Sequence, residues 1–168
     1  GAAAPRRPRS PGAFHGRDDE LATLAEAWRD AHRGAAATVL VEGEAGVGKT
    51  RLAYATLQQA AQSGSTVISA ACQALEHHLP FAPLADAIGR YIHTLPTAAL
   101  HSLPHNSLSQ LAQIVPSLQD RIPALPVIAS SGAEIFTLAN ENRQRLIDGI
   151  VAFLTALATL RPLVLFLD

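Results

Sequence analysis

The first apolar positions of the chain recur at a helical spacing. Leu21, Leu24 and Trp28 follow one another at i, i+3 and i+7, which places them on one face of a helix. Asp18 has the side chain of a helix N-cap, and Gly34 is a typical stop. We therefore expect a helix from about residue 18 to residue 33, with Trp28 as its core anchor.

Short apolar runs then alternate with a second helical pattern. Thr38–Glu42 (TVLVE) and Thr66–Ala71 (TVISAA) are rich in β-branched residues, which is typical of buried strands. Between them, Lys49–Gln62 has its apolar residues on one side, and Gly64 ends the pattern. A strand–loop–helix–strand unit of this length predicts a parallel sheet with a right-handed crossover.

The second half of the chain changes character. The segment 73–132 contains seven of the eleven prolines, with short apolar stretches between them, and predicts a helical insertion or lid. Glu134–Leu160 has the pattern of a long helix, and Leu163–Leu167 that of a third, fully buried strand. The whole pattern predicts an α/β fold in which helices cover a parallel sheet.

Composition limits the classes of function. Hydrophobic residues make up 48% of the 168 positions and charged residues 16%, with a net charge of −1, so neither nucleic acid nor a membrane surface is an expected partner. The apolar stretch 149–167 has the length of a membrane span, but Pro162 breaks it, and we expect no membrane span. A single cysteine, Cys72, excludes a disulfide framework and fits a cytoplasmic location.

Both ends of the sequence suggest a piece of a longer protein. Residues 1–12 are rich in Pro, Arg and small residues, and we expect them to form a disordered leader. The sequence has no methionine and stops at Asp168, directly after the last apolar run. We therefore expect one domain, residues 13–168, that continues in a missing C-terminal part.

The strongest chemical signal is the segment Gly43–Thr50. Its sequence, GEAGVGKT, matches G-x-x-x-x-G-K-[ST] in full, with a predicted strand before it and a helix after it. Glycines let the backbone approach an anion, and successive N–H groups at a helix start form a cavity for phosphate. Lys49, the only lysine of the chain, is expected to contact the β- and γ-phosphates, and the Thr50 hydroxyl to coordinate Mg²⁺. The alternative is an ordinary glycine turn that leads into a helix.

Asp168 is the second candidate. It ends the apolar run Leu163–Leu167, and in a phosphate-loop protein such a carboxylate faces the magnesium ion. The alternative is a buried strand with a solvated end.

Taken together, these motifs resemble a known group of proteins. Phe14-His15-Gly16-Arg17, then VLVEGEAGVGKTRL, LPFAPL and RPLVLFLD, are similar to the ATPase domain of AAA-type and STAND-class proteins, as in LuxR-family transcriptional regulators and ATPase modules linked to adenylate cyclases. The origin-recognition-like AAA domain is a wider relative. The resemblance spans Phe14 to Asp168, although His15 replaces the usual Val or Ile.

The resemblance implies a P-loop three-layer sandwich that is truncated after the Walker B strand, and it assigns roles to residues. Phe14–Arg17 matches a box near the adenine and ribose, the phosphate loop matches Walker A, and Asp168 matches the first Walker B acid. Lys49 and Asp168 are the expected catalytic residues, and Thr50 and Asp168 the expected metal ligands. The expected nucleotide-binding residues are Phe14, Gly16, Arg17, Gly43, Glu44, Ala45, Gly46, Val47, Gly48, Lys49, Thr50 and Arg51.

The function that follows is an ATP/ADP switch with Mg²⁺ in a larger regulatory protein, whose effector is a DNA-binding or cyclase domain and which can form homo-oligomers on binding ATP. Such a switch works because γ-phosphate contacts differ between the two nucleotides. Two alternatives remain open: a phosphotransferase acting on a small molecule, and a scaffold that binds nucleotide without hydrolysis. Since no second acid or arginine finger is identified, we expect these 168 residues alone to hydrolyse ATP slowly. Because the sheet would lack strands beside Leu163–Phe166 and leave an apolar edge, we also expect them to fold poorly.

Overall fold

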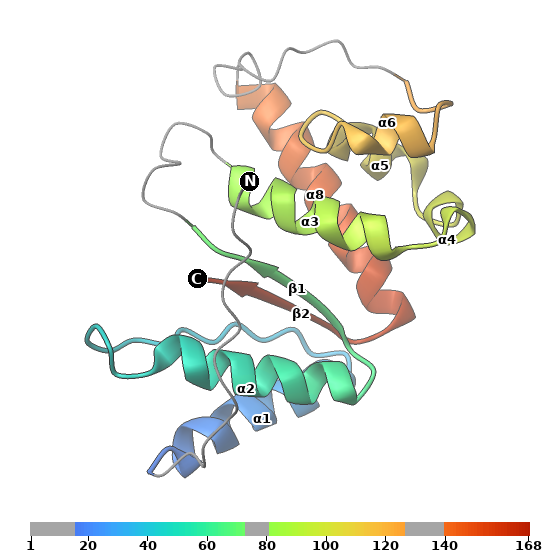
Figure 1. Cartoon of the computed structure of the whole chain (residues 1–168). Helices are drawn as coiled ribbons and strands as arrows, with labels where there is room; N and C mark the ends of the chain where they lie inside the picture. Colours follow the sequence, from blue (N-terminus) through green and yellow to red (C-terminus); the bar gives the residue numbers. More distant parts are fainter. Residues whose placement is uncertain (1–15, 73–80, 127–139) are drawn as a thin grey trace. The chain divides into compact units, whose positions relative to one another are not determined.

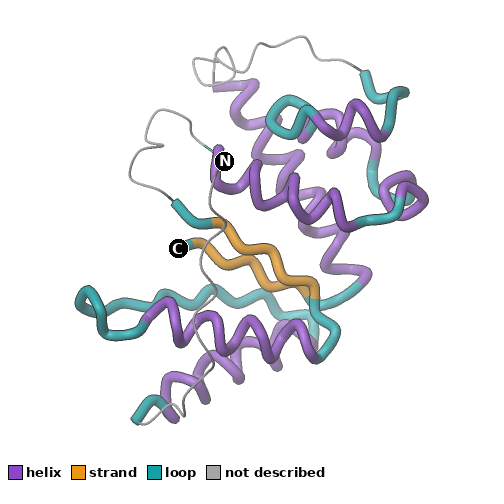
Figure 2. Tube along the Cα trace, viewed as in Figure 1, coloured by secondary structure: helices purple, strands orange, loops and turns teal. Residues whose placement is uncertain are grey.

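The structure is a computed structural model that describes residues 16–72, 81–126 and 140–168 (Figures 1 and 2). The predicted leader, Phe14, His15 and the first residues of the predicted long helix lie outside the described residues. The chain divides into two compact units, residues 1–65 and residues 66–168, and each is considered by itself.

The first unit contains two helices that pack together. They are α1 (Asp18–His32) and α2 (Lys49–Gln62). The second has the bounds that the sequence predicts, and its buried residues, Leu52, Ala53, Leu57 and Ala60, are those of the predicted apolar side. Gly34 and Gly64 follow the two helices with positive φ, as expected of C-terminal stops.

Two details of α1 differ from the prediction. Its N-cap is Arg17, whose carbonyl oxygen accepts the Leu21 N–H at 3.0 Å, so Asp18 is the first helical residue and not the cap. The acidic Asp18, Asp19 and Glu20 still occupy the first turn, where they favour the positive end of the helix. Trp28 is half-buried, and its indole Nε1–H donates to the Ser65 hydroxyl at 3.2 Å.

The predicted strand Thr38–Glu42 is not formed. The segment makes no ladder, and its side chains are largely exposed, with Val39 at 42% and Leu40 at 78%. A strand derives its stability from hydrogen bonds to a neighbouring strand. The described residues of the first unit contain no other strand with which this segment could pair, so β-branched composition alone does not produce a strand there.

The second unit contains the sheet. Its strands, β1 (Thr66–Ala70) and β2 (Leu163–Leu167), pair in parallel from Thr66 opposite Leu163 to Ala70 opposite Leu167. Both strands and their parallel pairing confirm the sequence prediction, with β1 one residue shorter. The expectation that Leu163–Leu167 is fully buried is wrong: none of its residues is buried, and Leu165 and Leu167 are 37% and 59% exposed. The result is a mixed fold of helices and strands with a small parallel sheet, which fits an α/β class of the phosphate-loop kind.

Prolines set the starts of the helices that follow β1. The helices are α3 (Ala82–Thr94), α4 (Thr97–His101), α5 (His105–Leu111) and α6 (Ser117–Arg121). Proline occupies the first turn of α3 and the N-cap positions of the other three. Because proline lacks an N–H and fixes φ, it suits a helix start and breaks a helix interior. The prediction of several short helices is confirmed within 81–126.

The long helix α8 (Asn140–Leu160) completes this unit and leads through Arg161 and Pro162 into β2. It gathers with α3–α6 on one side of the two strands (Figure 1). The predicted insertion therefore shares one hydrophobic core with β1 and α8, in which the largest fully buried side chains are Phe153, Ile68, Ile88, Ile92, Leu100, Leu108, Leu111, Leu118, Ile122 and Leu146. Within the described part of the chain, no helix is both long enough and apolar enough to cross a membrane.

Two arginines form hydrogen bonds with backbone carbonyl oxygens of other elements in this unit. Arg121 donates to the carbonyl oxygens of Ile92 and Leu95, at 2.5 and 2.7 Å, and so satisfies acceptors at the end of α3. Arg90, on α3, donates to the Ser69 carbonyl of β1 at 2.9 Å. A helix and a strand distant in sequence are thus joined by charge-assisted hydrogen bonds.

Candidate functional site

The loop before α2 takes a conformation that its glycines make accessible. Gly46 and Gly48 have φ values of 81° and 96°, a backbone conformation that residues with a side chain rarely adopt. Gly48 is also the N-cap of α2, and its carbonyl oxygen accepts the Leu52 N–H at 2.9 Å. The spacing of glycines in the motif therefore corresponds to a loop that turns directly into a helix.

At Gly43 the space around the residue is also limited. A Cβ at this position would lie 3.0 Å from Cγ1 of Val47 and 3.9 Å from Cδ of Lys49. The Val47 N–H donates to the Glu44 carbonyl oxygen at 3.4 Å, which closes a tight turn from Glu44 to Val47. A side chain at position 43 would therefore crowd Val47, whose side chain would have to shift by a few tenths of an ångström.

The Lys49 side chain lies over the first residues of this loop. Its Nζ donates to the carbonyl oxygens of Gly43 and Glu44, at 2.8 and 2.9 Å, while the helix that begins at Lys49 fixes its Cα. The ammonium is therefore held over the loop by two neutral acceptors. Phosphate oxygens carry charge and would make stronger, charge-assisted hydrogen bonds with the same group.

The start of α2 favours an anion. It has no side-chain cap and no acidic residue in its first turn, whereas the first turn of α1 has three acidic residues. The N–H groups of a first helical turn have no partner within the helix, and the helix dipole makes this end positive. Thr50 and Arg51 lie in this turn. Loop, lysine and helix start together fit a phosphate group.

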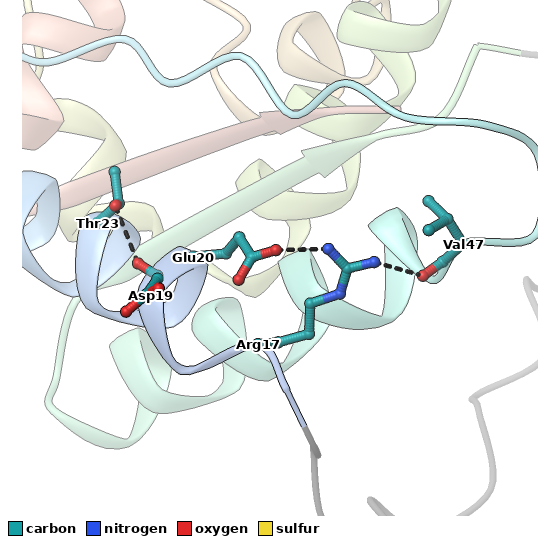
Figure 3. Close-up of polar contacts among 5 residues, drawn as sticks. All are labelled: Arg17, Asp19, Glu20, Thr23 and Val47. Carbon is teal, nitrogen blue, oxygen red and sulfur yellow. Dashed lines mark hydrogen bonds and ion pairs between the residues drawn. The ribbon is translucent and has the colours of Figure 1, made fainter.

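Arg17 extends the site from the start of α1 (Figure 3). Its Nη2 donates to the Val47 carbonyl oxygen at 3.3 Å, and its Nη1 pairs with the Glu20 carboxylate. The Arg17 guanidinium lowers the pKa of the Glu20 carboxyl below its ordinary value of 4.5, because it hydrogen-bonds the charged form, and the backbone N–H of Glu20 lowers it further.

The structure thus brings some of the expected residues together. Arg17 contacts the phosphate loop, as the position of its motif suggests, and Gly16 precedes it with φ 72°. Phe14 lies outside the described residues. The role of Glu20 was missed at the sequence level, although its spacing of three residues from Arg17 is a recognisable ion-pair signal.

Asp168 belongs to the second unit. It follows β2 and continues the ladder: its N–H donates to the Ala70 carbonyl at 3.0 Å, and its own carbonyl accepts the Cys72 N–H at 2.7 Å. Its backbone is therefore fixed by β1. Thr50 belongs to the first unit, and joint coordination of a metal ion by Thr50 and Asp168 stays a prediction.

Comparison with known proteins identifies one family. The sequence model of the AAA ATPase domain matches residues 13–168. No curated protein and no solved structure matches the chain.

Proposed function

The chain belongs to the AAA ATPase domain family, and from this premise we propose that its Gly43–Thr50 loop binds the phosphates of ATP or ADP with Mg²⁺. The observation that carries the proposal is the position of Lys49, whose ammonium lies across the loop on two carbonyl oxygens. These neutral contacts can be exchanged for phosphate oxygens with little movement of the helix. The family match supports nucleotide binding in general, and the geometry of the loop supports the proposal that Gly43–Thr50 is the binding segment.

Each part of the loop then has a task. Lys49 provides a compact positive charge for the β- and γ-phosphates, which the planar fork of an arginine would not replace. The N–H groups at the start of α2 bind phosphate oxygens, and Gly43 leaves the space for close approach. The Thr50 hydroxyl and the Asp168 carboxylate would hold Mg²⁺, which neutralises charge on the phosphates when bound. Arg51, next to Thr50, belongs to the same turn.

For the domain we further propose an ATP-dependent switch in a larger regulatory protein of the STAND or LuxR-regulator kind. The support is the resemblance of the Phe14–Arg17 box, the phosphate loop and the Asp168 strand to such proteins. In this proposal the sheet is part of a P-loop three-layer sandwich, the protein acts in the cytoplasm, and an effector domain reads the nucleotide state. Hydrolysis would use Lys49 and Asp168.

The alternatives predict different behaviour. A phosphotransferase would transfer the γ-phosphate to a small acceptor, whereas a scaffold would bind ATP and ADP equally and leave ATP intact. A switch requires that ATP and ADP favour different conformations of the protein, since a nucleotide that binds both conformations with equal affinity does not shift their populations.

Binding is tested by titrating a fluorescent ATP analogue into the wild type and into Lys49→Ala, with Mg²⁺ present. Loss of the charge should weaken binding at least tenfold, about 1.4 kcal/mol. Arg33→Ala is a suitable control, because Arg33 pairs only with Asp30 at the far end of α1 among the described residues. Equal affinities of wild type and Lys49→Ala would refute the assignment of the loop.

A further inference from the structure

Arg17 connects the start of α1 to the tip of the phosphate loop. Its two terminal nitrogens have different partners, the Glu20 carboxylate and the Val47 carbonyl oxygen (Figure 3). The guanidinium is planar and its N–H groups point in fixed directions, so an ion pair at one nitrogen orients the donor at the other. Glu20, one turn along the same helix, therefore directs Arg17 at the loop.

The acceptor belongs to a peptide group with unusual freedom. The Val47–Gly48 peptide is followed directly by Gly48, and the residue before Val47 is Gly46; both glycines have positive φ. Glycine allows many orientations of an adjacent peptide at low cost. The hydrogen bond from Arg17 selects one of them, with the Val47 carbonyl turned toward α1.

This orientation has a consequence for the opposite side of the peptide. In a planar trans peptide the C=O and N–H bonds point in opposite directions. When Arg17 holds the Val47 carbonyl oxygen, the Gly48 N–H is directed away from Arg17. A rotated peptide would instead direct a carbonyl oxygen, the negative end of the dipole, to the side that the N–H now faces.

We propose that Arg17, oriented by Glu20, is a positioning residue that fixes the Val47–Gly48 peptide in the orientation that accepts phosphate. The inference rests on the proposed function of the loop. It assigns Arg17 a role through the backbone and not through contact with the nucleoside. The lowered pKa of Glu20 agrees with it, because the carboxylate stays charged and paired at neutral pH.

Ligands with and without a nucleoside separate the two roles. The whole chain and its Arg17→Ala variant are titrated with Mg²⁺–ATP and with inorganic tripolyphosphate. Loss of this one exposed hydrogen bond should weaken binding of both ligands by about three- to tenfold. Arg33→Ala removes a similar i, i+3 ion pair from α1 without touching the loop and should leave both affinities unchanged.

A spectroscopic measurement reports on the peptide itself. In ¹⁵N-labelled protein without ligand, the Gly48 amide resonance should shift in Arg17→Ala and stay in place in Arg33→Ala. Circular dichroism verifies that both variants keep their helices. A merely structural contribution of Arg17 to α1 would not move the Gly48 resonance selectively.

The outcomes are distinct. Weaker binding of ATP with unchanged binding of tripolyphosphate would mean that Arg17 contacts the nucleoside, and would overturn the inference. Wild-type affinities in Arg17→Ala, with Lys49→Ala impaired, would also overturn it and leave the proposed function intact. If the wild type binds neither ligand, it is the proposed function that fails.

Discussion

Gly149 marks the closest approach of two helices in the second unit. It lies on α8, and a Cβ at this position would be 2.5 Å from Cβ of Gln110 on α5 and 3.1 Å from its Cγ. A Cβ atom is fixed to its backbone, so neither side chain can swing away. Gly149→Ala would therefore force α5 and α8 apart.

The size of the effect follows from two opposing contributions. Carbon atoms pack at about 3.5–4.0 Å, so the helices would have to separate by about 1 Å. Overpacking of this kind costs about 1–3 kcal/mol, and two anchored atoms place this site near the upper end. Replacing a helical glycine with alanine returns about 1 kcal/mol. We expect a net loss of about 2 kcal/mol, which lowers the melting temperature by about 4–8 °C.

The control is another helical glycine. On α3, a Cβ at Gly89 would meet only Cγ1 of Val115, at 3.4 Å, which is close to an ordinary contact with the end of a side chain. Gly89→Ala should therefore be neutral or stabilising by up to about 1 kcal/mol. Thermal unfolding followed by circular dichroism compares the two variants. Equal stabilisation by both substitutions would refute the close approach of α5 and α8.

Two further predictions concern arginines that organise the two units. Arg121→Met should lower the free energy of unfolding, measured by urea denaturation, by about 1–3 kcal/mol, because the part-buried carbonyl oxygens of Ile92 and Leu95 lose their donors. The control variant Arg90→Met should lose less. The Arg17–Glu20 pair should stabilise the wild type relative to Glu20→Gln above about pH 4.5. The difference in stability should vanish as the pH falls through the lowered pKa of Glu20, because the protonated carboxyl group no longer forms the ion pair. A difference in melting temperature that stays the same as the pH falls below 4.5 would contradict this account of the pair.

Local patterns predicted much of the fold. The helix Lys49–Gln62 and the strand Leu163–Leu167 appear with the expected bounds, since the first has a clear apolar side and a glycine stop and the second a short run between a proline and an acid. The closely spaced prolines likewise predicted several short helices after β1. Where a single segment carries the information, the sequence is sufficient.

Properties that depend on distant partners were less accessible. Thr38–Glu42 has the composition of a strand but forms none, because pairing is supplied by other segments and not by β-branched residues. The common core of α3–α6, β1 and α8 also could not be read from local patterns, since it joins residues far apart along the chain.

The candidate site shows the same division. The motif at Gly43–Thr50 predicts a glycine turn that leads into a helix and singles out Lys49, and in the structure the loop turns directly into α2, with Lys49 donating to the Gly43 and Glu44 carbonyl oxygens. The contact of Arg17 with the Val47 carbonyl depends on how α1 and α2 pack, and only the three-dimensional arrangement reveals it. The nucleotide-binding role of each residue stays a prediction.

The central claim is that ATP occupies the loop around Lys49, and the sequence offers a direct way to measure it. Lys49 is the only lysine, so an amine-acetylating reagent has two targets, its Nζ and the N-terminal amine. Mass spectrometry of the digested protein measures the acetylation rate of each, with and without Mg²⁺–ATP. The account predicts that ATP slows acetylation of Lys49 at least tenfold, as expected for a saturated site, and leaves the N-terminal amine unaffected. Equal rates at Lys49 with and without saturating ATP would contradict it.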